Sequence, residues 1–242
     1  MSTPNSQLPT PQGVNSQGAN SQGVNSQGVN SQAPNSQLPT PNSQGARGLL
    51  VVFEGLDQSG KQTQAERLRD HVLAGGRACE LLSFPAYETP IGHEIRAGLH
   101  GERDYGPDVM QLLYIANRFE RKPEIERLLA AGTIVVCDRY RASSVAYGEA
   151  HGLDARWLSD TQRHLPQPDL TILLDIAPET AARRKTADRD KYERDLALLS
   201  RVRESYRRQA EEGGWLRLDG SRDRAAVTAD VLSAVDSRLG QP

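Results

Sequence analysis

The sequence predicts an α/β fold in which helices flank a five-stranded parallel sheet. From about residue 49 onward, short and uninterrupted apolar runs alternate with longer segments of helical character. Apolar runs of this kind are typical of strands covered on both faces, and strands that alternate with helices imply parallel pairing through right-handed crossovers. The roughly 195 residues from Arg47 suit a single domain with a sizeable core.

The expected elements follow in order along the chain. The first strand, LLVVFE at 49–54, leads through a glycine-bearing turn into a helix near Lys61–Ala74 that the next two glycines end. Proline favours the first turn of a helix, so two helices are expected at 107–120 and 123–131. The remaining strands are expected at 78–84, 133–137, 170–176 and 215–218.

Residues 1–46 have a different composition from the rest of the chain. They contain no Lys, Arg, Asp, Glu, His or aromatic residue, and the tripeptide Asn-Ser-Gln recurs mostly every five residues. A segment so poor in apolar side chains cannot offset the entropy lost on ordering, which predicts a disordered low-complexity tail before a domain at 47–242. Two interpretations stay open: an expanded repeat without function and a flexible tether.

Charge and cysteine content narrow the class of protein. A net charge of −2 and a pI near 6.2 argue against a nucleic-acid-binding surface. No apolar run approaches the roughly 20 residues that a bilayer requires, so no membrane partner is expected. Cys79 and Cys137 lie far apart in predicted buried strands. Such isolated cysteines are usually reduced core residues, which favours a cytoplasmic setting.

The turn GLDQSGKQT is the strongest functional signal. It matches G-x-x-x-x-G-K between a predicted strand and a predicted helix. Its glycines let the backbone wrap a phosphate chain, so that N–H groups and the helix N-terminus face the phosphates, while Lys61 adds a charge near the β- and γ-phosphates. The pattern predicts an ATP site formed by Gly55, Leu56, Asp57, Gln58, Ser59, Gly60, Lys61, Gln62 and Thr63.

One position departs from the usual pattern. Gln62 follows the lysine where Ser or Thr normally binds Mg²⁺. Thr63 comes next, but one residue along a helix turns the side chain by about 100°. The metal is then expected to rely on ATP oxygens, water and carboxylates.

Two further motifs point to a second ligand. Asp138 and Arg139 follow the strand TIVVC, at the sheet edge where ligands bind in parallel sheets. An arginine there can bind an acceptor phosphate bidentately, although a plain surface ion pair is the alternative. Tyr114 and Arg118 share one helix face and can stack on a base and hydrogen-bond its edge; the alternative for them is a half-buried core contact.

Taken together, the motifs resemble one family. EGLDQSGK, FPAY followed by PIG, LLYIANR, DRY followed by SSVAY, LPQPDL and KYERD occur in this order. This order is similar to that of the thymidylate kinases, which are P-loop nucleoside monophosphate kinases. The resemblance extends over 47–242 and implies a three-layer P-loop kinase fold with a lid segment. It also implies transfer of the γ-phosphate of ATP to dTMP, giving dTDP and ADP for dTTP synthesis.

The resemblance implies a role for each matching residue of the dTMP site. Tyr114 corresponds to the aromatic that stacks on thymine, and Arg118 to the arginine that reads it. Phe84 and Pro85 shape the pocket around the base. Arg139 holds the dTMP phosphate. The set expected to bind dTMP is Asp57, Phe84, Pro85, Tyr114, Arg118, Asp138, Arg139, Ser143, Tyr147, Tyr192 and Glu193.

The resemblance implies more specific roles for four residues: Tyr147, Asp57, and the pair Tyr192 and Glu193 that follows the lid. Tyr147 packs beneath the sugar and leaves no room for a 2′-hydroxyl, so deoxyribonucleotides are preferred. Asp57 lies near the 3′-hydroxyl and the metal. Tyr192 and Glu193 close on the acceptor, and Asp57 with Glu193 is the expected Mg²⁺ pair.

The family places a catalytic arginine either after the P-loop Asp or in the lid. Gln58 occupies the first position here and cannot neutralise charge, so the cation is expected in the lid around 181–191. The candidates there are Arg183, Arg184 and Arg189. A solvated basic loop is the alternative for this cluster, and Arg184 has a second possible position against adenine, near 219–221. The expected catalytic groups are therefore Lys61, Asp57, Arg139 and one of these arginines.

The combined interpretation is a cytoplasmic dTMP kinase that uses ATP and Mg²⁺ and, like its family, forms a homodimer. Two alternatives remain at this point. One is a kinase of the same fold with another deoxynucleotide or a nucleoside as acceptor. The other is a non-enzymatic nucleotide-binding or scaffold protein, suggested by Gln62 and the long polar tail.

Overall fold

The computed structural model describes residues 47–184 and 195–240. The repeat tail predicted at 1–46 lies outside these residues. The first described residue already joins the fold, because Arg47 Nη1 donates a hydrogen bond of 2.9 Å to Asp169 Oδ1 and Gly48 N–H donates one of 2.8 Å to Leu129 O.

The predicted five-stranded parallel sheet is confirmed. Its strand order is β2-β3-β1-β4-β5, and each pair of neighbours is parallel. β1 is central and buried along its whole length, as its continuous apolar sequence predicts. The strands are β1 (Leu50–Glu54), β2 (Cys79–Ser83), β3 (Ile134–Asp138), β4 (Leu170–Asp175) and β5 (Leu216–Asp219). Each differs from its expected range by at most one residue at either end.

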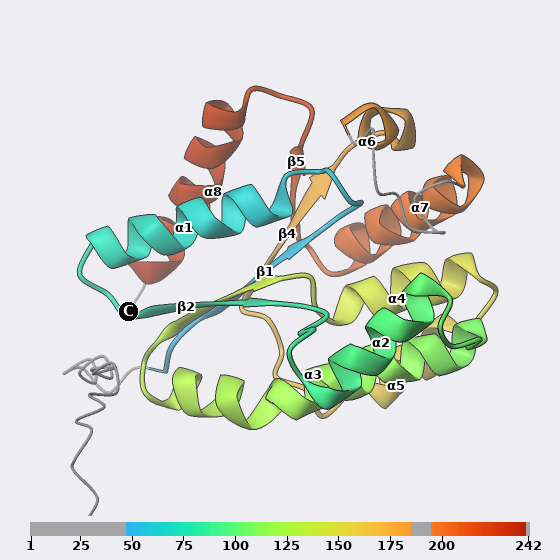
Figure 1. Cartoon of the computed structure of the whole chain (residues 1–242). Coiled ribbons are helices and arrows are strands. Elements are labelled where there is room, and N and C mark those ends of the chain that lie inside the picture. The colour runs from blue at the N-terminus through green and yellow to red at the C-terminus, as the bar shows by residue number, and fades with distance from the viewer. Residues whose placement is uncertain (1–46, 185–194, 241–242) are drawn as a thin grey trace, which may run out of the picture. The chain divides into compact units, whose positions relative to one another are not determined.

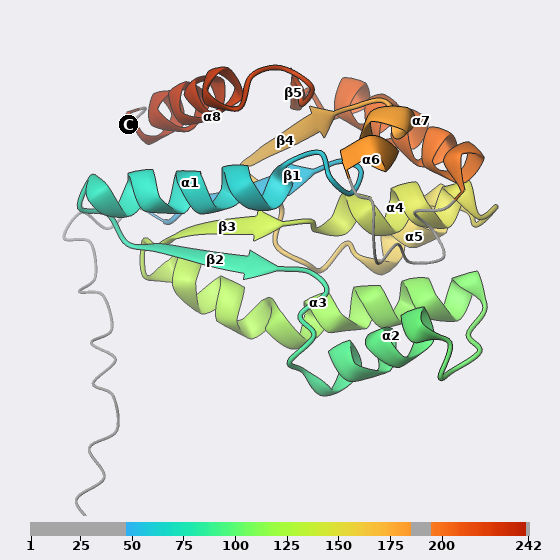
Figure 2. The ribbon, with the colours of Figure 1, turned by 45° about the horizontal axis from the view of Figure 1, so that its top comes forward.

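Helices cover both faces of the sheet and make three layers (Figures 1 and 2). α1 and α8 pack on one face, where Leu68 and Val231 meet Phe53 and Ile172 of the sheet. The other face is covered by α3, α4 and α7. The helices are α1 (Lys61–Ala74), α2 (Pro90–His100), α3 (Pro107–Ala130), α4 (Arg141–Ala150), α5 (Ala155–Thr161), α6 (Pro178–Arg184), α7 (Leu196–Glu212) and α8 (Arg224–Leu239).

The prediction of two helices at 107–120 and 123–131 is wrong, because α3 is a single helix with Pro123 inside it. Proline has no N–H to give to the preceding turn, which normally ends or bends a helix. Here Ile125, Leu128 and Leu129 beyond the proline are buried in the core. Their burial favours continuation of the helix across the missing hydrogen bond.

The crossovers bring the functional segments to one edge of the sheet. β1 leads into the loop before α1, and β3 leads through Arg139 into α4. β2 ends beside β3, at the cis peptide bond between Phe84 and Pro85. Because all strands are parallel, these three exits lie at the carboxyl edge, where open α/β sheets bind ligands.

The structure explains the glycine of the PIG motif. Gly92 N–H donates a hydrogen bond of 3.0 Å to Thr89 Oγ1, the N-cap of α2. A Cβ on Gly92 would lie 1.9 Å from the carbonyl oxygen of Ala86. The absent side chain therefore lets α2 pack directly on the segment that follows Phe84 and Pro85.

Gly92→Ala is expected to lower the free energy of unfolding by about 2–3 kcal/mol, because the added methyl group forces two backbones apart. Gly75→Ala is the matched control, since its Cβ would approach no heavy atom closer than 3.4 Å; it should change stability by less than about 0.5 kcal/mol. Urea unfolding of both variants measures the difference. Equal stabilities would contradict the close approach at Gly92.

Candidate active site

The loop between β1 and α1 forms an open, phosphate-binding type of turn. Gly60 is the N-cap of α1 with a φ of 98°, and no side chain caps the helix. Gln58 also has a positive φ, 63°. The first N–H groups of α1 therefore remain available to an anion. A cavity lies over this loop and is lined by residues of the loop, by Asp138, and by Arg184 and Gly220 from across the site.

Lys61 provides the positive charge of this cavity. Its side chain is only 5 % exposed, and Nζ donates a hydrogen bond of 2.8 Å to Leu56 O. Burial and then the neighbouring Arg139 lower the pKa of Lys61, while Asp57, whose Oδ1 is 4.0 Å from Nζ, acts in the opposite direction. A bound polyphosphate would relieve the repulsion between the two cations, so the site favours an anion.

The side chain of Gln62 is engaged on the surface of α1. Its Nε2 donates a hydrogen bond of 2.9 Å to Glu66 Oε1. Thr63 contributes to the lining of the phosphate-loop cavity. Gln62, which replaces the usual Ser or Thr, therefore has a side-chain amide that is already hydrogen-bonded to Glu66, one turn along the helix.

Asp138 lies in the phosphate-loop cavity, whereas the sequence interpretation grouped it with the acceptor site. Its Oδ1 is buried and accepts no hydrogen bond from any described residue. A carboxylate oxygen without a donor is a suitable ligand for a hard divalent cation. The described residues contain no group of three or more His, Cys, Asp or Glu side chains that could hold a metal alone. A metal here would therefore depend on additional oxygens from its ligand.

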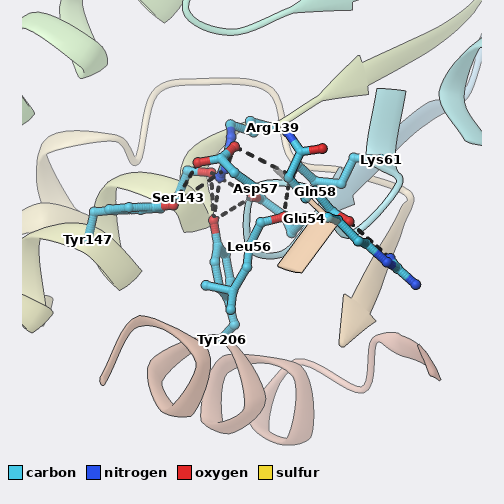
Figure 3. Close-up of polar contacts among 10 residues, drawn as sticks. Glu54, Leu56, Asp57, Gln58, Lys61, Arg139, Ser143, Tyr147 and Tyr206 are labelled. Carbon is cyan, nitrogen blue, oxygen red and sulfur yellow. Dashed lines mark hydrogen bonds and ion pairs between the residues drawn. The ribbon is translucent and has the colours of Figure 1, made fainter. Parts of the chain in front are cut away.

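Arg139 is the centre of the polar contacts shown in Figure 3. Its Nη2 donates to Asp57 Oδ1 at 2.5 Å, and its Nη1 donates to Ser143 Oγ at 3.2 Å and Tyr206 Oη at 3.0 Å. Burial lowers the pKa of Arg139, but Asp57 and, less strongly, Tyr147, Tyr206 and Asp138 together outweigh this effect and raise the pKa above its usual value. The side chain is 14 % exposed, so its charge faces the site with little competition from water.

The backbone at Arg139 is unusual. Its φ is 66°, in the left-handed region that costs a non-glycine residue about 1–3 kcal/mol. Two hydrogen bonds hold the turn: Arg139 N–H donates to Phe53 O at 2.9 Å, and Tyr140 N–H donates to Glu54 Oε1 at 3.0 Å. β1 thus sets the direction in which the chain leaves β3.

Two members of this network, Glu54 and Tyr206, were not identified from the sequence. Glu54 is fully buried and also accepts hydrogen bonds from Ser143 Oγ at 2.7 Å and Tyr206 Oη at 3.2 Å. An acidic residue that ends an apolar strand was a signal that could have revealed Glu54. Tyr206 lies in α7, far along the chain, and no local pattern marks it.

A second pocket lies beside Arg139 and brings together most of the residues predicted for the acceptor. Its lining includes Phe84 and Pro85 after β2, Tyr114 and Arg118 of α3, and Tyr147 of α4. Leu99 of α2 and His151 after α4 also line it and were not predicted. The combination of aromatic rings with convergent polar groups is typical of a small-molecule site.

Arg118 is buried in this pocket and fixed by its neighbours. Its Nη1 donates hydrogen bonds of 2.8 Å to Ser144 Oγ and 3.1 Å to Tyr114 O. The guanidinium carbon lies 6.0 Å from the centre of the Phe84 ring. Burial lowers the pKa of Arg118 to about 10, so the group stays charged at neutral pH.

Tyr147 and Arg139 both line this pocket, side by side. The guanidinium carbon of Arg139 lies 5.4 Å from the centre of the Tyr147 ring. The Tyr147 hydroxyl lies 3.4 Å from Asp57 Oδ2 and 3.5 Å from Arg139 Nη2, both at the long limit for hydrogen bonds.

The lid candidates differ in what they contact. Arg184, at the end of α6, donates hydrogen bonds of 3.0 Å to Gln58 O and to Gly220 O, so it spans the phosphate-loop cavity. Arg183 contacts Thr180 within its own helix. Arg189, Tyr192 and Glu193 lie outside the described residues, so their expected roles remain predictions.

The two cavities meet at Asp57, which lines both of them. An anion held by the phosphate loop and Lys61 would therefore lie next to an anion held by Arg139. This arrangement is suited to moving a phosphoryl group between two ligands, because both can be positioned and their charges neutralised by fixed cations.

Comparisons with known proteins agree with this geometry. The family model described as thymidylate kinase matches residues 53–231. A thymidylate kinase of Arabidopsis thaliana is 38 % identical over 202 residues, which cover 84 % of this chain and 73 % of that protein. The human thymidylate kinase is 33 % identical over 188 residues, covering 76 % and 88 %. The structure of a Candida albicans thymidylate kinase described as having broad substrate specificity matches with a TM-score of 0.67 and 27 % identity, covering 80 % of this chain and 93 % of that one.

Proposed function

Because the chain belongs to the thymidylate kinase family and transfers the γ-phosphate of ATP to dTMP, we propose that ATP binds over the phosphate loop and dTMP in the pocket beside Arg139. The observation that carries this assignment is the position of Asp57 in the lining of both cavities. The alternative of another acceptor is not favoured, and neither is a non-enzymatic protein, since the relatives are kinases by name.

In the acceptor pocket, we assign the base to the inner end and the phosphate to the end at Arg139. Tyr114 and Phe84 supply rings that can stack on thymine, and buried Arg118 supplies donors for its carbonyl oxygen. Arg139 binds the dTMP phosphate beside Ser143. Tyr147 lies under the sugar and excludes a 2′-hydroxyl.

Catalysis in this arrangement rests on positioning and charge. The acceptor phosphate oxygen is ionised at neutral pH, so it needs no strong general base. Lys61 stabilises charge on the transferring phosphoryl group from one side, and Arg139 holds the attacking phosphate on the other. Closure of a lid over these groups would exclude water and limit hydrolysis of ATP.

Mg²⁺ is the expected cofactor, and Asp57 and Asp138 are the described residues that would hold it. The fit rests on the buried, donor-free Oδ1 of Asp138 in the phosphate-loop cavity. When bound, the ion would neutralise charge on the ATP phosphates and bring ATP oxygens into its own coordination shell. Glu193 was also expected to contribute and lies outside the described residues.

The expected assembly comes from the family, and the expected location comes from the cysteines. We infer a homodimer, supported by Val109 and Leu112, two apolar side chains of α3 that are 40 % and 43 % exposed. We also infer a cytoplasmic setting, supported by the free thiols of Cys79 and Cys137. No described helix combines the length and the apolar composition needed to cross a membrane.

A coupled ADP-release assay with dTMP, dUMP, dCMP and dTDP as acceptors tests the proposed function. We expect dTMP to give the highest kcat/KM, and the chain starting at Arg47 to match the intact chain. Lys61→Ala is the negative control and should lose most of its turnover, by roughly a hundredfold or more, because it removes a fixed cation from the phosphates. Preference for another acceptor would contradict the assignment of the pocket.

Arg184→Ala should lower kcat by on the order of a hundredfold, since we propose that Arg184 is the cation that reaches the phosphates from α6. Arg183→Ala is the matched control from the same helix and should change kcat by less than about threefold, because within the described residues its side chain hydrogen-bonds Thr180 of α6. Steady-state kinetics with saturating ATP and dTMP separate the two. A larger loss at Arg183 would transfer the role to that residue.

Tyr147→Ala should relax discrimination between the deoxyribose and ribose forms of the acceptor, since the ring that fills the space below the sugar is gone. Tyr147→Phe keeps the ring and should keep the discrimination, because the ring still fills the space below the sugar and the hydroxyl contacts with Asp57 and Arg139 are long. The ratio of kcat/KM for dTMP and its ribonucleotide counterpart measures this. Unchanged discrimination in the alanine variant would remove the proposed sugar contact.

A further inference from the structure

One end of the Arg139 guanidinium is occupied by hydroxyl groups. Nη1 carries two hydrogens and donates to Ser143 Oγ and to Tyr206 Oη. Nη2 donates to Asp57 Oδ1 at 2.5 Å and makes a long contact of 3.5 Å with Tyr147 Oη. Among the described residues, no acceptor contacts Nε. The Nε side is therefore the part of the guanidinium left to meet a phosphate, and the contacts of Nη1 and Nη2 decide where this side points.

A buried carboxylate determines the direction of the hydroxyl hydrogens. Glu54 Oε2 accepts from Ser143 Oγ at 2.7 Å and from Tyr206 Oη at 3.2 Å, and the two hydroxyl oxygens are 2.8 Å apart. A carboxylate can only accept hydrogen bonds, so Ser143 Oγ donates its hydrogen to Glu54, and the hydroxyl hydrogen of Tyr206 is directed toward Glu54 Oε2 and Ser143 Oγ. The lone pairs of Ser143 and Tyr206 are then left to accept from Arg139. Figure 3 shows this convergence of Glu54, Ser143 and Tyr206 on the guanidinium.

Tyr206 is well suited to such a structural role. Its side chain is 1 % exposed, on α7, which packs against α4, the helix that carries Ser143. Burial, followed by the charge of Glu54, raises the pKa of the Tyr206 hydroxyl. The hydroxyl therefore remains a proton donor throughout the physiological pH range.

We propose that Glu54 and Tyr206 are positioning residues for the acceptor phosphate: Glu54 orients the hydroxyls of Ser143 and Tyr206, and these aim the Nε side of Arg139 at the phosphate. The proposal rests on the proposed role of Arg139 in binding dTMP. It extends the site to a residue of α7, and it predicts an effect that is specific to the phosphate and absent for the nucleoside part of the ligand.

Binding of dTMP and of thymidine, measured by calorimetry on the full chain, tests this specificity. Tyr206→Phe removes only the hydroxyl and should weaken dTMP binding roughly tenfold, because the hydrogen bond it accepts comes from a charged group. Thymidine has no phosphate, so its affinity should stay within about twofold. Tyr105→Phe is the matched control: Tyr105 Oη also donates to a carboxylate, Glu94, at 2.8 Å, but it does not line the acceptor pocket. This control should leave both affinities unchanged.

Glu54→Gln provides a second variant of nearly the same shape. With its carbonyl oxygen facing Tyr140 N–H, the new amide would donate to the two hydroxyls and reverse their hydrogen direction, so dTMP should again weaken while thymidine does not. Thermal unfolding of each variant shows whether it is folded. A loss of stability with equal effects on both ligands, or with no effect on dTMP, would overturn the positioning role.

Arg139→Ala separates this proposal from the one on which it depends. A roughly hundredfold loss of dTMP affinity in Arg139→Ala, with no selective loss in Tyr206→Phe, would leave the phosphate role of Arg139 standing and overturn only the positioning role. If Arg139→Ala binds dTMP as well as the parent does, both proposals are wrong. A selective loss in all three variants supports the whole network.

Discussion

The contact between Arg139 and Asp57 is the interaction around which the site is organised. It joins the residue after β3 to the loop after β1, so it connects the two strand exits that face the two cavities. The pair is shielded on one side by Tyr147 and on the other by the hydroxyls of Ser143 and Tyr206. Because the guanidinium is buried, its charge is weakly screened and acts strongly on whatever anion enters.

This contact has a cost that the rest of the fold must offset. Arg139 takes a left-handed backbone conformation, and Glu54 is a carboxylate with no exposed surface. Strained backbone and buried charge persist only where hydrogen bonds compensate for them. Here the same groups supply the compensation, since Glu54 accepts from Tyr140 N–H at the strained turn and from the hydroxyls beside Arg139. The hydrogen bonds of Glu54 thus stabilise the strained turn at Arg139 and also compensate for the burial of the Glu54 carboxylate.

The layered fold explains how residues from distant parts of the chain reach this point. β1 lies between β3 and β4, so its phosphate loop is next to Arg139 on one side and near the exit of β4, which leads to α6 and Arg184, on the other. α3 lies on the face of the sheet opposite α1 and α8, and its Arg118 and Tyr114 line the pocket beside Arg139. On the same face, α7 packs on α4 and supplies Tyr206. An enzyme that transfers a phosphoryl group between two anionic substrates requires this convergence, because fixed cations must offset the repulsion between the two phosphate groups as they approach.

The sequence alone determined the sheet, the phosphate loop and most of the acceptor pocket. Continuous apolar runs reveal buried strands. G-x-x-x-x-G-K, the pair Asp138-Arg139 after a strand, and Tyr114 and Arg118 on one helix face are local patterns, whereas Phe84 is expected only from the resemblance to the family. The continuity of α3 through Pro123 could not be predicted from local patterns. It depends on the burial of residues beyond the proline in the core, which overrides the local preference of proline to end a helix. Local patterns also do not predict that Asp138 faces the phosphate loop, or that Glu54 and Tyr206 meet around Arg139. Their positions depend on strand order and on the packing of α7 against α4. Contacts between residues so far apart in the sequence produce no periodic pattern of residue types from which they could be predicted.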